Sequence, residues 1–314
     1  SDTDTEVLLY LYAEHGRDLV EHLRGMYAFA LYDEQKQGLL MARDPYGIKP
    51  LYYADDGSAL HLASQVQALR SVGPVDTAPS PAGHVGFFLW GHVPEPHTLY
   101  RGIQALPAGH TCWVDRENGP QAPRAFASIP KALRRADAET KANGCASETE
   151  LRDALLESVK HHLVADVDVG LFLSAGLDSA TLTALASEVH GRIKTVTLGF
   201  EEFRGTPNDE VPGAERIAER YGTDHETVWV TQSDFAAAHD DFLSAMDQPT
   251  IDGANSYFVS RAAREAGLKV ALSGLGGDEL FGGYPSFSQI PRLVSAVGAV
   301  PGAAAVGKGL RAVA

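Results

Sequence analysis

The stretch from residue 171 to residue 179 has the features of a phosphate-binding loop. An apolar segment, Leu-Phe-Leu at 171–173, runs into Ser-Ala-Gly-Leu-Asp-Ser at 174–179, and residues 180–186 favour a helix. A short loop between a buried strand and a helix N-terminus presents free backbone N–H groups and the positive end of the helix dipole. The sequence therefore predicts a phosphate site here. It is not a Walker A loop, because no Gly-Lys-Ser/Thr follows, and an ordinary strand–turn–helix corner is the alternative interpretation.

A second glycine-rich loop lies further along the chain. Val-Ala-Leu at 270–272 breaks into a segment with five glycines among the eleven residues 273–283. Glycine costs backbone entropy, so this density is expected where the backbone approaches a ligand closely. Asp278 and Glu279 place carboxylates beside that approach. We predict that Asp178 and Asp278 share a Mg²⁺ ion, which combines few protein carboxylates with substrate phosphates; a solvated acidic turn is the alternative interpretation.

These motifs carry a family resemblance. The first loop resembles the pyrophosphate loop, Ser-Gly-Gly-x-Asp-Ser, of enzymes that split ATP between the α- and β-phosphates, and both loops together resemble the synthetase domain of glutamine-hydrolysing asparagine synthetases. Residues 24–33 and 43–53 resemble the later part of a class II glutamine amidotransferase domain, the N-terminal half of the same family. Because the two motif sets occur in the family's order over nearly the whole chain, the chain is identified as a member.

The resemblance implies ATP and Mg²⁺ as ligands and assigns residues to them. The metal is assigned to Asp178 and Asp278, and glutamine to Asp4 in Thr-Asp-Thr-Glu at 3–6. Leu173 and Leu198 are expected to offer only main-chain groups to the adenosine and to be core residues as well. The residues assigned to ATP are Leu173, Ser174, Gly176, Asp178, Ser179, Leu198, Ser273 and Gly274.

The resemblance also implies a reaction. In the family, an acceptor carboxylate attacks the α-phosphate of ATP, which gives an acyl-adenylate and pyrophosphate, and ammonia from glutamine then displaces AMP. The implied partners are ATP, glutamine and aspartate as the acceptor, with a homodimer as a further expectation. Such chemistry requires charge neutralisation on the triphosphate and exclusion of water from a mixed anhydride.

The sequence departs from the family pattern in both loops. Ala175 stands where the family has the loop's first glycine, and a methyl group is tolerable there if that residue keeps a negative φ. Leu275 occupies the position of a glutamate that the family uses in forming the adenylate. Leucine can neither pair with an ion nor accept a proton, so the catalytic residue is left unassigned. Either another group supplies this function or the acceptor is not aspartate.

The glutaminase nucleophile of the family is a cysteine at the mature N-terminus, whose own α-amino group acts as the base. This chain has Cys112, in an expected strand, and Cys145, in an expected linker. Both are interpreted as structural or incidental, so the chain alone is not expected to hydrolyse glutamine. Because it begins with Ser1 and lacks the family's downstream lysine region, it is expected to be incomplete at both ends.

The composition indicates a globular protein. With 314 residues, two domains are the natural expectation, and 44% hydrophobic with 21% charged residues is enough to bury a core. The formal net charge of −15 argues against a nucleic-acid surface. No apolar run long enough for a membrane span and no signal peptide are found, so we expect a cytoplasmic protein with reduced thiols and no membrane partner.

The first domain is predicted over residues 1–127 as a partial, antiparallel β-rich, glutaminase-like domain. Residues 4–22 read as one or two amphipathic helices. An antiparallel meander of short strands follows at 25–33, 38–43, 50–54 and 59–64, with further β segments at 85–91 and 110–114.

The second domain is predicted over residues 148–314, after a linker of little periodicity at 128–147. Its fold is expected to be a parallel-sheet α/β domain, similar to adenine-nucleotide α-hydrolases and partial in this chain. Ligands bind such sheets beyond the carboxyl ends of the strands, where both glycine loops emerge. The tail 293–314 is expected to be a packed helix pair or a frayed end. Strands are predicted at 167–173, 193–199, 225–230 and 268–272, and helices at 179–190, 210–221, 233–246 and 255–266.

Three functional interpretations remain open. The first is an ATP-dependent amide-forming ligase of the asparagine synthetase type. The second keeps the adenylation but changes the acceptor, as in the β-lactam synthetase branch; Leu275 and the missing cysteine favour it, whereas segments 24–33 and 43–53 argue against it. The third is a non-catalytic nucleotide-binding fragment.

Overall fold

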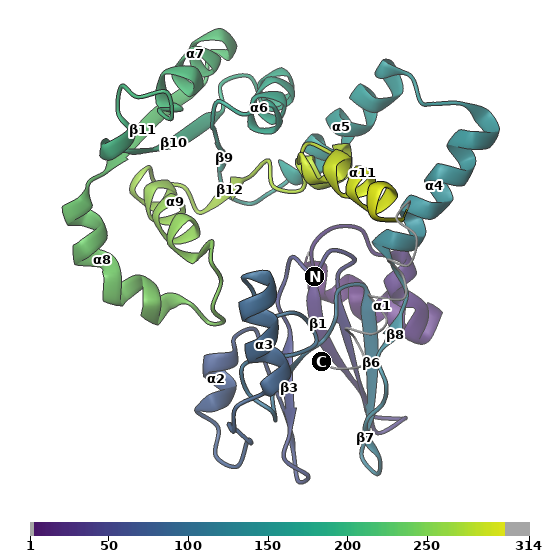
Figure 1. Ribbon diagram of the computed structural model, residues 1–314. Helices are drawn as coiled ribbons and strands as arrows, with labels where there is room; N and C mark the ends of the chain where they lie inside the picture. The colour runs from purple at the N-terminus through teal and green to yellow at the C-terminus, as the bar shows by residue number, and fades with distance from the viewer. Residues whose placement is uncertain (1–2, 299–314) are drawn as a thin grey trace. The chain divides into compact units, whose positions relative to one another are not determined.

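The chain forms two units. The structure, a computed structural model, describes residues 3–298. Of these residues, unit 1 holds 3–147 together with 238–257, and unit 2 holds 148–237 together with 258–298. Figure 1 follows the chain through both units. The sequence predicted one uninterrupted second domain, so the grouping of 238–257 with unit 1 is a feature that sequence patterns did not indicate.

Up to residue 147, the described part of unit 1 contains the two N-terminal helices, three further helices and eight short strands. The helices α1 and η1 lie within the predicted helical range 4–22. The elements are α1 (Asp4–His15), η1 (Gly16–His22), β1 (Ala28–Asp33), β2 (Gly38–Arg43), β3 (Tyr52–Asp55), β4 (Leu60–Ala63), α2 (Val66–Arg70), α3 (Pro81–Trp90), β5 (Gln104–Ala105), β6 (His110–Asp115), β7 (Gly119–Pro120), β8 (Arg124–Ala125) and α4 (Ile129–Asn143).

The strands of unit 1 form two antiparallel sheets rather than one meander. One sheet has the order β1-β2-β6-β7, with β8 also paired to β6, and the other has the order β4-β3-β5. The predicted pairing of successive strands is therefore wrong between β2 and β3. Leu40, Met41 and Ala42 of β2 are almost fully buried, so β2 is a central strand that needs β6 as a second neighbour. The connection from β2 to β3 contains Pro45 and Pro50 and is too long for a tight hairpin.

Two other segments differ from the sequence prediction. Residues 85–91 were predicted as β structure but lie largely in α3, which begins at Pro81 after the N-cap Ser80; the Ser80 hydroxyl accepts a hydrogen bond from the Gly83 N–H at 3.3 Å. Serine followed by proline is a helix-start signal that the apolar content of the segment obscured. The linker contains α4, an exposed helix that carries the ion pairs Arg135–Glu139 and Lys141–Asp137.

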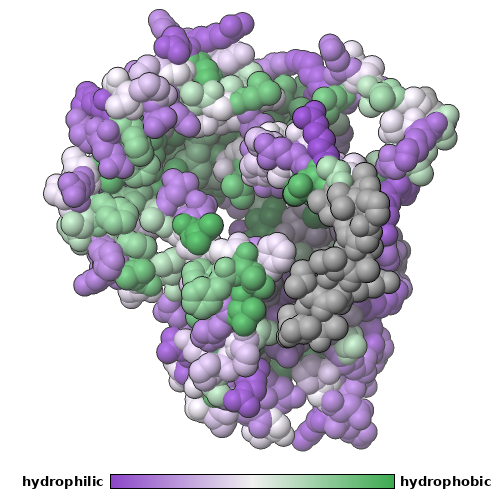
Figure 2. All heavy atoms as spheres, viewed as in Figure 1, coloured by the Kyte–Doolittle hydropathy of each residue, from purple (hydrophilic) through white to green (hydrophobic). Residues whose placement is uncertain are grey.

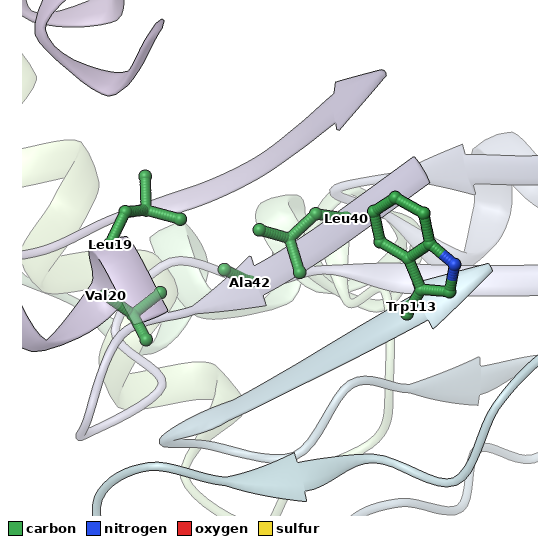
Figure 3. Close-up of a cluster of buried hydrophobic side chains, with 5 residues drawn as sticks. All are labelled: Leu19, Val20, Leu40, Ala42 and Trp113. Atoms are coloured by element: carbon green, nitrogen blue, oxygen red, sulfur yellow. The ribbon is translucent and has the colours of Figure 1, made fainter. Parts of the chain in front are cut away.

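One of the buried hydrophobic clusters of unit 1 lies between η1 and the larger sheet. Figure 3 shows Leu19 and Val20 of η1 beside Leu40 and Ala42 of β2 and Trp113 of β6. All five are buried, and Leu19 is completely inaccessible to solvent. Burial of these apolar side chains fixes the helical N-terminus onto the sheet.

The segment 238–257 is held in unit 1 by hydrogen bonds to residues that are distant in sequence. The Asp247 carboxylate accepts the backbone N–H groups of Val66 at 2.7 Å and Gln67 at 2.8 Å, at the N-terminus of α2. The Leu99 N–H donates to the Gln248 side chain at 3.0 Å, and the Ile251 N–H donates to the Gly91 carbonyl at 2.8 Å. A carboxylate suits a helix N-terminus, which explains why Asp247 occupies this position.

Unit 2 has the predicted alternation of strands and helices. Its strands form one parallel sheet of order β11-β10-β9-β12, which confirms the predicted parallel sheet. The part of the tail prediction that concerns 299–314 lies outside the described residues. The elements of the second half of the chain are α5 (Glu148–His162), β9 (Val169–Phe172), α6 (Leu177–His190), β10 (Lys194–Phe200), η2 (Glu201–Phe203), α7 (Val211–Tyr221), β11 (Asp224–Val230), α8 (Gln232–Ala245), α9 (Gly253–Glu265), β12 (Val270–Leu272), α10 (Gly277–Phe281) and α11 (Ser286–Gly298).

Helices cover both faces of the parallel sheet. Leu171 of β9 packs in one cluster with residues of α5 and α6, whereas Val196 of β10 packs in another cluster with Ala262 and Ala263 of α9. Leu171 pairs with Thr195 in register, so Val196 points to the opposite face. Burial on both faces is typical of parallel sheets and explains the continuous apolar runs in the sequence.

Truncating Leu171 is expected to destabilise unit 2. Leu171 is 1% exposed, so Leu171→Ala removes buried methyl groups and leaves a cavity, which costs about 2–5 kcal/mol of the free energy of unfolding. Leu177→Ala is the matched control, because Leu177 is 82% exposed and should change stability by less than about 0.5 kcal/mol. Urea unfolding followed by circular dichroism measures both. Equal stability of the two variants would contradict the assignment of Leu171 to the core.

Both apolar and polar side chains reach the surface. Figure 2 shows green apolar atoms between purple polar atoms on the face that it draws. Among the described residues, no helix combines the length and the apolar character needed to cross a lipid bilayer.

Candidate functional site

The first loop leaves β9 at the carboxyl edge of the parallel sheet. Leu173 is 2% exposed, its N–H donates to the Val196 carbonyl at 2.9 Å, and its carbonyl accepts the Thr197 hydroxyl at 2.6 Å. The main chain of Leu173 is thus already engaged in extending the sheet. Leu198, the other predicted main-chain contact, lies in β10, is half-buried and packs against the α9 cluster. Both leucines therefore have a structural role at the base of the site.

The Ser179 hydroxyl fixes the shape of the loop 174–179. It accepts the Ser174 N–H at 3.1 Å, lies 2.9 Å from the Ser174 hydroxyl, and has the carbonyls of Ser174 and Gly176 at 3.1 and 3.2 Å. Ser179 is 7% exposed. These contacts close the loop around one buried hydroxyl, so Ser179 shapes the loop and Ser174 is the more accessible of the two serines.

The loop ends at the N-terminus of α6, a helix of 14 residues whose N-cap is Gly176. Within the described structure, no side chain caps this end, and Asp178 lies in the first turn. The first-turn N–H groups of a helix have no partner inside the helix and carry the positive end of its dipole. This end of α6 therefore has the backbone geometry that the sequence predicted for a phosphate site.

The alanine in this loop is accommodated by a glycine elsewhere. Gln37 is the one non-glycine residue with positive φ among those that the structure describes, so Ala175 keeps the negative φ that a side chain needs. A Cβ on Gly213 of α7 would lie 2.6 Å from the Ala175 methyl. Gly213 thus leaves the space that the alanine occupies.

The second loop meets the first at Asp178. A Cβ on Gly274 would lie 3.0 Å from the Asp178 Cβ and 3.1 Å from the Ser179 nitrogen, and one on Gly277 would overlap the Asp178 carboxylate. Gly276, between them, has a φ of +99°, which favours glycine. The structure therefore brings the two predicted loops into direct contact, and glycine is required because the backbone of one lies against a carboxylate of the other.

Asp278 is held against a further glycine. A Cβ on Gly283 would overlap the Asp278 carboxylate, and the Gly283 N–H donates to the Asp278 carbonyl at 3.0 Å. The Tyr284 hydroxyl donates to Glu279 at 2.9 Å. This hydrogen bond raises the pKa of Tyr284, and the partial loss of water around the hydroxyl and the negative charges of Glu279, Asp278 and Asp178 raise it further. The charges of both predicted metal ligands thus act on one hydroxyl.

The remaining predicted residues lie around this contact or outside unit 2. Ser273 is exposed, and its hydroxyl accepts the Leu275 N–H at 3.3 Å. Leu275 is 87% exposed. Because leucine is apolar, its side chain contributes no polar group to the loop. Asp4 is the first residue of α1 in unit 1, where its exposed carboxylate accepts the Thr5 hydroxyl at 3.4 Å.

Two buried charged residues, Arg43 and Asp44, hold the backbone of segment 43–53 of unit 1 in place. Asp44 is inaccessible to solvent, and its carboxylate accepts the N–H groups of Tyr46, Ile48 and Lys49 at 3.0–3.1 Å. The guanidinium of Arg43 donates to the carbonyls of Lys49, Gly47 and Leu106 and pairs with Glu95. The observed contacts give these charged residues a structural role, because buried charges persist where they are paired and hydrogen-bonded.

Cys112 does not have the environment of an activated nucleophile. Cys112 is 1% exposed in β6, and burial raises the pKa of its thiol to about 11. Cys145 is exposed. Since the thiolate is the reactive species, Cys112 is unreactive near neutral pH. This agrees with the structural interpretation of Cys112 from the sequence.

Two family models match successive parts of the chain. Residues 150–312 match the family model described as asparagine synthase, and residues 1–126 match that of the glutamine amidotransferase domain. The chain belongs to the glutamine-hydrolysing asparagine synthetase family. The family resemblance that the two loops and the two N-terminal segments indicated is thereby confirmed.

Curated relatives align along most of this chain. A protein of Mycobacterium bovis is 36% identical over 295 residues, which are 92% of this chain and 44% of that protein. Asparagine synthetase [glutamine-hydrolyzing] 1 of Bacillus subtilis is 33% identical over 92% of this chain and 44% of its own length. Asparagine synthetase B of Escherichia coli is 31% identical over 92% of this chain and 48% of its own length. The chain thus spans less than half the length of these asparagine synthetase relatives.

Several residues that shape the site were not identified from the sequence. Gly277 and Gly283 were recognised only as part of a glycine-rich stretch, and their contacts with the two aspartates depend on the tertiary fold. Gly213 gave no signal at all. Tyr284 follows two glycines and could have been singled out as an aromatic residue that ends a ligand-binding loop.

Proposed function

We propose that unit 2 binds ATP and Mg²⁺ between the loops 174–179 and 273–278. The observation that carries this proposal is the contact of Gly274 and Gly277 with Asp178 at the uncapped N-terminus of α6. It places backbone N–H groups, small residues and carboxylates at the carboxyl edge of a parallel sheet, where ligands bind in such folds. The family membership supports a nucleotide as the ligand.

The donor set fits a magnesium nucleotide. Asp178 and Asp278 would hold the metal, which when bound neutralises charge on the phosphates. The first-turn N–H groups of α6 and the Ser174 hydroxyl would bind phosphate oxygens. With a net charge of −15, the protein needs such local groups to attract an anionic nucleotide.

The proposed reaction has two steps. An acceptor carboxylate oxygen forms a bond to the α-phosphorus of ATP, the bond from that phosphorus to the bridging oxygen breaks, and pyrophosphate leaves. Ammonia nitrogen then bonds to the carbonyl carbon of the acyl-adenylate, AMP leaves with the bonding electron pair, and the nitrogen loses a proton. The residues of the two loops would bind and orient the phosphates.

Aspartate is the proposed acceptor. Glutamine, bound at Asp4, is the proposed source of ammonia, and the proposed assembly is a homodimer. Leu275 favours a second candidate, a ligase of the same chemistry that adenylates another carboxylate, because the loop carries no acidic side chain at that position. The two candidates share the ATP site and differ only in the acceptor.

An assay of pyrophosphate release tests the proposal. The chain is incubated with Mg·ATP, ammonia and either aspartate or a panel of other carboxylic acids, so that glutamine hydrolysis is not needed. We expect release that depends on the acceptor and is highest with aspartate. Release with another acid alone would reject the asparagine assignment and keep the ATP chemistry, whereas absence of release with every acid would contradict adenylation by this chain.

A further inference from the structure

The chain reverses direction directly after α10. Gly282 caps this helix with a φ of +72°, and the N–H groups of Gly282 and Gly283 both donate to the Asp278 carbonyl. A left-handed cap of this kind favours glycine and ends a helix sharply. The reversal returns Tyr284 to the side of α10 that carries Glu279.

Tyr284 is held at both ends. Its ring stacks on that of Phe287, with centroids 6.3 Å apart and an angle of 10° between the planes, and its hydroxyl donates to the Glu279 carboxylate at 2.9 Å. A charge-assisted hydrogen bond is about twice as strong as a neutral one and orients the carboxylate that accepts it. The rotamer of Glu279 is therefore set by Tyr284, although both side chains are exposed to solvent.

Glu279 is the remaining carboxylate of the second loop. Asp278 is assigned to the metal, and Leu275 carries no polar group. The pair lies next to both aspartates, because Gly283, which precedes Tyr284, lies against the Asp278 carboxylate, and Gly277, in the same short helix as Glu279, lies against the Asp178 carboxylate. Outer carboxylates of this kind orient the groups around a metal and change its affinity about 10–100-fold when they are removed.

We propose that Tyr284 is a positioning residue that holds the Glu279 carboxylate beside Asp178 and Asp278 as an outer acidic group of the metal–nucleotide site. This inference rests on the proposed function and deepens it. Glu279 adds negative charge next to the cation without being one of its two assigned protein ligands. Tyr284 and Glu279 together thereby supply a fixed carboxylate, which the apolar side chain of Leu275 cannot supply.

The test is a double-mutant cycle on the intact chain, with ATP binding measured by calorimetry at several Mg²⁺ concentrations. Tyr284→Phe removes only the hydroxyl and keeps the ring on Phe287, and Glu279→Gln keeps the side-chain volume. We expect each variant to weaken Mg²⁺-dependent ATP binding about 10-fold, to leave metal-free ATP binding unchanged, and to keep the melting temperature. The double variant should resemble Glu279→Gln alone, because Tyr284 acts through Glu279.

Tyr221→Phe is the matched control, since Tyr221 ends α7 about 12 Å along the helix from Gly213. Tyr221→Phe should bind Mg·ATP as tightly as the unaltered chain does. Two results would overturn this inference and leave the proposed ATP site intact. One is that Tyr284→Phe binds Mg·ATP as tightly as the unaltered chain. The other is that Tyr284→Phe weakens Mg·ATP binding equally whether or not Glu279→Gln is also present. Absence of Mg²⁺-dependent binding in the unaltered chain would overturn the proposed function and this inference together.

Discussion

Replacing either aspartate of the two loops by asparagine is expected to weaken Mg·ATP binding by at least about 100-fold. Asp178 lies in the first turn of α6 and Asp278 in the first turn of α10, and their loops are in direct contact at Gly277. Mg²⁺ is bound through few protein carboxylates, so the loss of one charge removes a large part of the protein's contribution. Removal of outer groups alone costs about 10–100-fold, and a direct ligand should cost more.

Calorimetry with Asp178→Asn and Asp278→Asn measures this effect. Asp166→Asn serves as the control, because Asp166 is exposed in the loop that precedes β9. Both site variants should keep the far-ultraviolet circular dichroism of the unaltered chain. Should only one of them lose metal-dependent binding, the shared metal site would be wrong and the other aspartate would have a different role.

Gly277→Ala is expected to reduce Mg·ATP binding about as strongly, although it adds only a single methyl group. The new Cβ would overlap the Asp178 carboxylate, which must then move from its position at the α6 N-terminus. The backbone does not resist the change, because Gly277 has no positive φ and begins α10, where alanine has the higher helix propensity. We therefore expect the fold to persist while the metal site is lost.

Gly73→Ala provides the matched control. No atom lies within 4 Å of the Cβ position at Gly73, and its φ is not positive. Binding and stability of this variant should equal those of the unaltered chain. Unchanged Mg·ATP binding by Gly277→Ala would mean that Asp178 tolerates displacement and is not a metal ligand.

The parallel sheet and both loops could be predicted because local patterns dictate them. Apolar runs such as 169–173 end at small residues, and the carboxyl ends of parallel strands share one edge, so two loops distant in sequence were expected to converge. The structure shows the convergence at Asp178. The roles of the individual residues in binding ATP stay predictions.

The parts that could not be predicted depend on contacts between distant residues. The pairing of β2 with β6 follows from burial of β2 on both faces, and sequence periodicity does not specify a partner. The grouping of 238–257 with unit 1 rests on Asp247 at the N-terminus of α2. Gly283 is needed because of where the Asp278 carboxylate lies, which no local pattern reveals.

The central claim is that the loops 174–179 and 273–278 form one site for ATP and a divalent cation. Calorimetric titration of the unaltered chain with ATP, with and without Mg²⁺, tests it most directly. We predict one nucleotide per chain, with binding that is strengthened by Mg²⁺ and is competed by pyrophosphate. Absence of ATP binding, or binding that is indifferent to Mg²⁺ and to pyrophosphate, would contradict the account.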